Sequence, residues 1–510
     1  MHGEGEREDA KDRPDQIGAT DGGGGTVSTL VLPSRTDAVV RAASAVIGGP
    51  AGTRMRVGAR RFGPGGGRLW IISVLVVLAG VVLGLGVLQK EHCRADGWST
   101  PDQFWHACYS DSAVLHGSAG LGRPDGPSLV DAVGPEGLGQ PPLSSAAMWL
   151  VARLAPGDGL FAARRFFDLS ALLMVAALAV AIACVVAASG RRPWDAAHLA
   201  LAPVLVTVGL LSYDLLAVAL TAGSVLAWSR RREILGGLLI GLAISTRPIL
   251  AAVLIAVLAL TARTGNWRAS LRYLVPAGAT WIGLRLLLMP GTTGGVLESY
   301  RAWRLTGPGY GSIWLIPQLL GQSEPTIFKR SGILSKIWYS GGGVSPWAAT
   351  LGVLVALAVV AVATFVLGLS TASRPRLVHL ALFAVAGTLM VTKSVPVQAS
   401  LVLLPLVALA GFRWRDHLVW AGTEVAYFVG VWLYIAASSD ANKGLPSGAY
   451  LVLLLARLGG IAWLMLTAVR AMREPVTDPV RVPPDGSVRA DDPQGGVFDG
   501  APDALVVRVV

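Results

Sequence analysis

The feature that most limits the fold of this 510-residue chain is a series of long apolar runs, separated by short connectors that carry arginine. Hydrophobic residues make up 53% of the chain and charged residues 15%, whereas soluble proteins usually contain about 45–50% and about 25%. Such runs match the hydrocarbon core of a bilayer, which an α-helix crosses in about 20 residues. The sequence therefore predicts an all-α integral membrane protein.

We predict about twelve transmembrane helices between residues 68 and 472, flanked by disordered cytoplasmic tails at residues 1–67 and 473–510. The first tail ends in the basic stretch RMRVGARRFGPGGGR, which the positive-inside rule places in the cytoplasm. Large polar stretches predict external loops at about residues 89–165 and 290–346. The expected location is the plasma membrane, with both termini inside and the active site outside.

The tripeptide Thr246-Arg247-Pro248 interrupts the apolar run from Ile234 to Leu260. If this run forms one kinked helix, the arginines of the later connectors lie on the external side of the membrane. If it forms two short helices (legs) that turn at Arg247, these arginines all lie on the cytoplasmic side. We choose two legs, because cytoplasmic connectors collect arginine. The net charge of +11 then reflects topology, so we expect no nucleic acid as a partner.

Four ionisable residues fall on the external side: Asp111, Asp214, Arg247 and Lys393. Several neighbouring helices have only about 14–16 apolar residues, so their outer ends should stop inside the bilayer and surround an outward-facing cavity. A carboxylate beside cations in such a cavity suits sugar transfer from a lipid phosphate to a hydroxyl, since the acid accepts a proton and the cations stabilise the leaving phosphate. Taken singly, each residue could instead be a solvated acid, a helix cap or a snorkelling cation.

Four segments together suggest a family: CYSDSAVLHGSAGL (108–121), SYDLLAVALTAGSVLAWSRRREILGGLLIGLAISTRPIL (212–250), GPGYGSIW (307–314) and TKSVPVQASLVLLPLVALAGFRWRDHLVW (392–420). Their order and spacing resemble the polyprenyl-phosphate-sugar-dependent mannosyl- and arabinosyltransferases of glycosyltransferase family 87, GT-C membrane enzymes of actinobacterial cell envelopes. The resemblance implies a GT-C-type bundle that moves mannose or arabinose from polyprenyl phosphate to an envelope glycolipid or glycan, with inversion. The donor's tail would lie between helices, in contact with membrane lipids. We expect no metal or other cofactor.

The resemblance also implies roles for individual residues. Asp111 would be the general base. Asp214 matches the Asp of an Asn-Trp-Asp-like family segment, and Lys393 with Gln398 matches a Lys-x-x-Ser-Pro-Gln-like segment. The residues expected to contact the donor phosphate or the sugars are Arg247, Lys393, Asp214, Arg304, Gln398, His116, Tyr310 and Trp314.

Some residues depart from the family pattern, and two other functions stay open. Thr306 stands where the family usually has arginine, and Arg301 or Arg304 could compensate. Glu424 lies within an expected crossing, and we interpret it as a structural residue. The alternatives are a flippase or transporter for lipid-linked sugars and an inactive homologue that binds glycolipid. The helices show no obvious repeat between halves, which argues against a transporter.

Cysteine and histidine gather in the first loop. Cys93 and Cys108 could form a disulfide or remain two thiols, and the sequence favours neither. His92, His106 and His116 match no zinc-binding spacing with these cysteines, so we expect histidines that contact sugar or water and no metal site.

Overall fold

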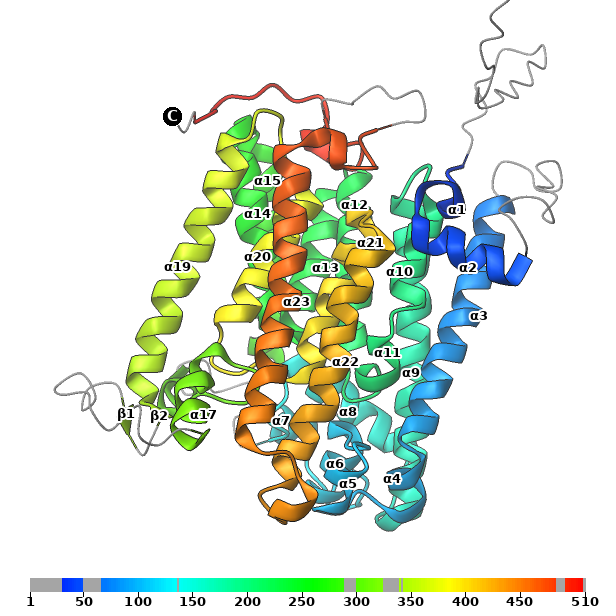
Figure 1. Ribbon diagram of the computed structural model, residues 1–510, viewed down its shortest axis with the longest axis vertical. Helices are drawn as coiled ribbons and strands as arrows, with labels where there is room; N and C mark the ends of the chain where they lie inside the picture. Colours follow the sequence, from blue (N-terminus) through cyan, green and yellow to red (C-terminus); the bar gives the residue numbers. More distant parts are fainter. Residues whose placement is uncertain are drawn as a thin grey trace, which may run out of the picture.

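The structure is a computed structural model that describes residues 30–48, 66–134, 137–288, 300–323, 339–340, 343–482 and 491–507. Most of its helices run side by side along the long axis of the molecule (Figure 1). Five helices in the described ranges are long and apolar enough to cross a bilayer. They are α3 (Gly66–Gln89), α9 (Gly159–Ala188), α19 (Pro346–Ser370), α22 (Trp414–Ala436) and α23 (Ser447–Arg473). The predicted all-α membrane fold is confirmed.

A second set of apolar helices is shorter. It comprises α12 (Asp214–Ser229), α13 (Glu233–Thr246), α14 (Ala252–Thr264), α20 (Leu377–Val391) and α21 (Leu404–Ala410), the last continuing the 3-10 helix η5 (Val397–Leu403). Helices of 13 to 16 residues cover about 20–24 Å, less than the roughly 30 Å hydrocarbon core of a bilayer. They are packed among α9, α15 (Trp267–Leu288), α22 and α23. Several helix ends therefore lie inside the bundle.

The interruption at Arg247 separates two antiparallel legs. Nε1 of Trp228, near the end of α12, donates a hydrogen bond of 3.0 Å to the carbonyl of Gly495. Arg263, near the end of α14, pairs with Asp503 at 2.8 Å. Because α12 and α14 both end against the C-terminal segment, α13 leads away from that end of the bundle and α14 returns to it. The helix stops at Arg247, whose backbone is extended, because the proline that follows disfavours a helical conformation in the residue before it.

Both loops gather at the opposite end of the bundle from the C-terminus (Figure 1). The described part of the first loop folds into five short helices, α4 (Glu91–Asp96), α5 (Asp102–Trp105), α6 (Asp111–Ser118), α7 (Leu129–Val133) and α8 (Pro142–Leu154). It ends at Gly159, where α9 begins, earlier than the expected boundary at about residue 165. In the second loop, the helix at 300–305 is followed by η3 (Ile313–Leu315), α17 (Ile316–Ser323) and a hairpin of β1 (Tyr339–Ser340) with β2 (Gly343–Val344).

The C-terminal tail differs from the expectation of disorder after residue 473. The described residues 474–482 and 491–507 pack against the helix ends. Buried Arg376 pairs with Asp478 and Asp492, each at 3.2 Å, and Arg374 pairs with Asp503 at 3.0 Å. The composition of the tail is typical of disorder, but its acids satisfy arginines that the bundle buries, and charges buried in protein need such partners.

Part of the N-terminal tail is also ordered. Residues 30–48 include α1 (Pro33–Thr36) and α2 (Ala38–Gly48). Asp37, between these helices, accepts a hydrogen bond of 2.9 Å from the backbone N–H of Trp414 at the start of α22. The remaining expected tail, residues 1–29 and 49–65, lies outside the described residues.

Candidate functional site

A cavity of about 990 Å³ lies where the interrupted helices meet the first loop. Its walls include Phe104, Tyr109 and Asp111 from the first loop, Arg247 after α13, Arg285 from α15, Trp303 and Tyr310 from the second loop, Gln398 from η5, and Trp432 from α22. Of the residues selected from the sequence, the structure thus brings together Asp111, Arg247, Tyr310 and Gln398.

Asp111 is the first residue of α6 and is held in place from both sides. The preceding residue, Ser110, is fully buried, and its hydroxyl donates to the carbonyls of Leu210 (3.0 Å) and Leu211 (3.3 Å). These contacts tie the start of α6 to the segment just before α12. On the other side, Nε2 of Gln398 donates to Oδ2 of Asp111 at 2.9 Å. The carboxylate is therefore fixed at the cavity wall.

The environment of Asp111 favours a group that can accept a proton near neutral pH. Burial raises the pKa of Asp111 to about 6, because removal from water disfavours the charged carboxylate. A hydrogen bond from the Tyr109 hydroxyl and the charges of Arg247 and Lys90 act in the opposite direction and keep the pKa from rising further. A carboxyl group with this pKa is mostly ionised at pH 7 and is a stronger base than an exposed aspartate.

Arg247 reaches the cavity from the turn after α13, and Asp214 supports it. Nη2 of Arg247 lies 2.7 Å from Oδ2 of Asp214, and Nε contacts the other carboxylate oxygen. Asp214 is buried, it is the first residue of α12, and it also accepts a hydrogen bond from Ser212. It does not belong to the cavity wall. Asp214 thus orients the guanidinium of Arg247 without lining the cavity itself, and Arg247 contributes a positive charge to the cavity wall.

Lys393 has a different place from the one expected for a phosphate ligand. Its Nζ donates to the carbonyls of Trp303 (3.0 Å), Arg304 (3.2 Å) and Thr306 (2.9 Å), at the end of the helix at 300–305. The ammonium also lies 4.7 Å from the centre of the Trp303 ring. All three of its donors are used on the backbone, so Lys393 holds the second loop against the bundle. The Arg304 side chain is exposed and is not part of the cavity wall.

The remaining predicted residues divide between the cavity and the packing around it. Tyr310 lines the cavity, and its ring makes edge contacts with Tyr434 and Tyr450. Trp314 donates from Nε1 to the carbonyl of Val391 at 2.8 Å and is not part of the wall. His116 is buried against Phe166 and contacts the backbone carbonyl of residue 155. Trp314 and His116 therefore support the fold around the site.

Arg285 is a cavity residue that the sequence reasoning missed. Its guanidinium packs over the ring of Trp281 with 5.8 Å to the centroid, and its buried Nε has no hydrogen-bond partner. Among the described residues it has no acidic partner. The available signal was a lone arginine inside an apolar run, which marks a functional position in a membrane helix.

Glu424 is structural, as the sequence suggested. Its Oε2 accepts from Nε of Arg457 (3.0 Å) and from Ser400 (2.9 Å), and both charged groups are buried. Arg457 also donates to the carbonyls of Val395 (2.7 Å) and Pro396 (3.2 Å). These two residues line the cavity, so the ion pair supports the wall next to Gln398.

A comparison with known protein families identifies the class of enzyme to which this protein belongs. The profile of glycosyltransferase family 87 matches residues 140–394, half of the chain. The protein belongs to glycosyltransferase family 87. It is therefore a membrane glycosyltransferase of GT-C type, and the cavity is its candidate active site. The match includes Arg247 and Arg285 and excludes Asp111 and Gln398, whose assignment rests on geometry. No match was found among curated proteins or among solved structures.

The contacts of Lys393 predict the effect of its replacement. In Lys393→Met, the end of the helix at 300–305 loses three hydrogen bonds from a charged donor, each contributing about 1.5–3 kcal/mol. Chymotrypsin cleavage after Trp303 in the purified protein should become faster by roughly tenfold or more. Lys443→Met, at an exposed loop lysine, serves as the control. Equal protection in the two variants would contradict the role of Lys393 as a loop clamp.

Proposed function

We propose that this glycosyltransferase transfers mannose or arabinose from a polyprenyl phosphate to a hydroxyl of a cell-envelope glycolipid or glycan, with inversion at the anomeric carbon. The observation that carries the proposal is one cavity that contains a carboxylate with a raised pKa, Asp111, together with two arginines, Arg247 and Arg285. A base and a pair of cations are the groups that the transfer of a sugar from a phosphate ester requires.

In the proposed reaction, Asp111 accepts the proton of the acceptor hydroxyl while the hydroxyl oxygen bonds to the anomeric carbon. The bond between that carbon and the phosphate oxygen breaks, and its electron pair leaves with the phosphate. The donor is a phosphodiester with one negative charge, and the departing polyprenyl phosphate carries two once this bond has broken. Asp111 then releases its proton to water. Arg247 and Arg285 stabilise the charge that gathers on this phosphate.

Neighbouring residues position these groups. Gln398 and Tyr109 hydrogen-bond the carboxylate of Asp111 and orient it in the cavity wall. Tyr310 and Trp432 offer aromatic surfaces against which a sugar ring can pack. The proposal assigns no step to a metal or other cofactor, because the arginines supply the positive charge.

Two features support an active site outside the cytoplasm, in the plasma membrane. Cys93 and Cys108 form a disulfide in the first loop, and disulfides persist in oxidising compartments. The other end of the bundle carries the arginine-bearing connectors at 190–192, 230–232, 263–268, 374–376 and 413–415, as cytoplasmic connectors do. Both described termini lie at that end (Figure 1), so the proposal places them in the cytoplasm.

Replacement of the base tests the assignment directly. Asp111→Asn keeps the shape of the side chain and removes its ability to accept a proton. In proteoliposomes with labelled polyprenyl-phosphate mannose or arabinose and an envelope-lipid acceptor, its transfer rate should fall by about 10²–10⁴. Asp125→Asn, at an exposed acid of the same loop, should keep the wild-type rate. Undiminished product from Asp111→Asn would refute the role, and label that crosses the bilayer unchanged would indicate a flippase.

The pKa of Asp111 predicts how the reaction depends on pH. Only the ionised carboxylate accepts a proton, so kcat/KM should rise with pH through about 6 and reach a plateau above it. In Tyr109→Phe the midpoint should move to higher pH, since the hydrogen bond that favours the carboxylate is lost. A midpoint near 4, the ordinary range of an exposed aspartate, would contradict the environment described here.

The role of Arg285 is tested by a neutral replacement of similar size. Arg285→Gln removes a charge from the proposed phosphate site and should lower kcat/KM by about 10²–10³. Arg272→Gln, at an exposed position on the same helix, is the matched control. Similar rates in the two variants would remove Arg285 from the site.

A further inference from the structure

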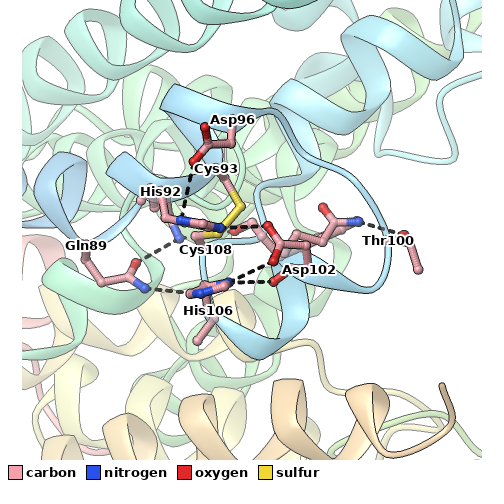
Figure 2. Close-up of a disulfide and its surroundings, with 12 residues drawn as sticks. Gln89, His92, Cys93, Asp96, Thr100, Asp102, His106 and Cys108 are labelled. Atoms are coloured by element: carbon pink, nitrogen blue, oxygen red, sulfur yellow. Dashed lines mark hydrogen bonds and ion pairs between the residues drawn. A yellow bond between two sulfur atoms is a disulfide. The ribbon is translucent and has the colours of Figure 1, made fainter. Parts of the chain in front are cut away.

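Two histidines and an aspartate converge in the first loop, outside the cavity. His92 belongs to α4, and Asp102 and His106 lie at the start and just after the end of α5. Nε2 of His92 is 2.7 Å from Oδ2 of Asp102, and Nδ1 of His106 is 3.1 Å from Oδ1 of the same carboxylate. Figure 2 shows the two rings turned toward Asp102, and their centroids are only 3.6 Å apart. The three potential ligand atoms lie within 4.8 Å of one another.

Asp96 contacts His92 on the side of the ring that faces away from Asp102. Oδ2 of Asp96 lies 3.5 Å from Nδ1 of His92, the ring nitrogen that faces away from Asp102 (Figure 2). In the metal-bound state, where the ion replaces the proton that Nε2 now shares with Asp102, a carboxylate in this place can accept the proton of Nδ1. Metal-binding histidines commonly have such a partner, which sets the tautomer and the ring orientation. His92 is therefore already oriented as a metal ligand.

The surroundings hold the cluster together and leave it open to solvent. The disulfide between Cys93 and Cys108 joins α4 to the segment that follows α5, and each cysteine is next to or near one of the histidines in the chain. The side chains of His92, Asp102 and His106 are 37%, 35% and 47% exposed, so an ion can reach them. The backbone spacing is thus fixed while the ligand atoms remain accessible.

We propose that His92, Asp102 and His106 bind a divalent transition metal of the zinc class, with water completing the coordination. Two imidazoles and one carboxylate suit Zn²⁺ and are poor ligands for Mg²⁺ or Ca²⁺, which prefer oxygen. Tetrahedral zinc with bonds of about 2.0–2.2 Å places its ligand atoms roughly 3.3 Å apart. The observed separations of 2.7 Å and 3.1 Å involve the two oxygens of Asp102, and all three ligand atoms lie within 4.8 Å of one another. Side-chain shifts of roughly 1.5 Å at most would bring them to this geometry. The ion would replace the protons that the rings now share with the carboxylate.

The site's position indicates what the ion does. It joins α4 to α5, and α5 carries Phe104, a residue of the cavity wall. The same loop then continues through Tyr109 to Asp111. A bound ion would therefore make the loop that carries the proposed base more rigid, without contact with the donor. The proposed metal site can be tested independently of the transfer reaction, because its ligands are not residues of the cavity wall.

The test is zinc binding by the full-length protein, purified in detergent without a polyhistidine tag. After treatment with a chelator and dialysis against Zn²⁺, the wild type should retain about one equivalent per chain, and Zn²⁺ should raise its midpoint of thermal unfolding. Co²⁺ should give the absorption of tetrahedral coordination. The double variant His92→Gln, His106→Gln should lose the bound metal and both responses. Asp96→Asn should bind about 10–100-fold more weakly.

Three controls keep the result interpretable. Glu91→Gln changes an acid on the same helix that pairs with Arg94 instead, and it should bind zinc as the wild type does. Asp102→Asn is a second ligand variant in case the double variant fails to fold, and it should also lose the ion. Asp111→Asn should keep the zinc although it stops transfer, so that the two proposals can fail separately. Zinc retention by the ligand variants, or equal loss in Glu91→Gln, would overturn the site.

Discussion

The structure depends on a mismatch between helix length and membrane thickness. Helices such as α12, α13 and α20 have 14 to 16 residues, so some of their ends lie inside the bundle, where backbone groups and charges cannot reach bulk water. Irregular backbone at membrane depth is tolerated only where it is buried in protein or lines a cavity. The ion pair of Asp214 with Arg247 joins the ends of two such helices. Because of this pairing, neither of these two charges is left unsatisfied beside the cavity.

The requirement that buried charges have partners also separates residues that can act on a ligand from residues that hold the site in place. Lys393 uses all three of its donors on the backbone, and Oε2 of Glu424 pairs with Arg457; these residues hold a loop and a wall of the cavity in place. Arg285, by contrast, faces the cavity without an acidic partner in the described chain. Gln398 and Tyr109 both hydrogen-bond the Asp111 carboxylate, which still lines the cavity. For Arg285, the lack of an acidic partner therefore indicates availability to a substrate better than charge alone does.

Sequence patterns predicted the helical bundle and the break at Arg247, because each depends on a local feature: apolar length and a proline. They also selected Asp111, an acid in a polar loop, which the structure places in the cavity wall. They could not predict that Lys393 would contact carbonyls 87 to 90 residues away. The grouping of His92 with Asp102 could not be predicted for a similar reason, because the expectation of no metal site rested on the spacing of histidine and cysteine alone. Directions of side chains in three dimensions are not encoded in spacing along the chain.

The order of the C-terminal segment has a consequence for how the protein is made. Residues 491–507 leave the ribosome after every membrane helix described here, and they carry carboxylates that pair with Arg263, Arg374 and Arg376. Until translation reaches them, these arginines must remain hydrated at the membrane surface, and the helix ends that carry them cannot pack fully. Synthesis of this segment and full packing of the helix ends are thus coupled, so a chain released before it would be distinguishable by its uncovered basic surface.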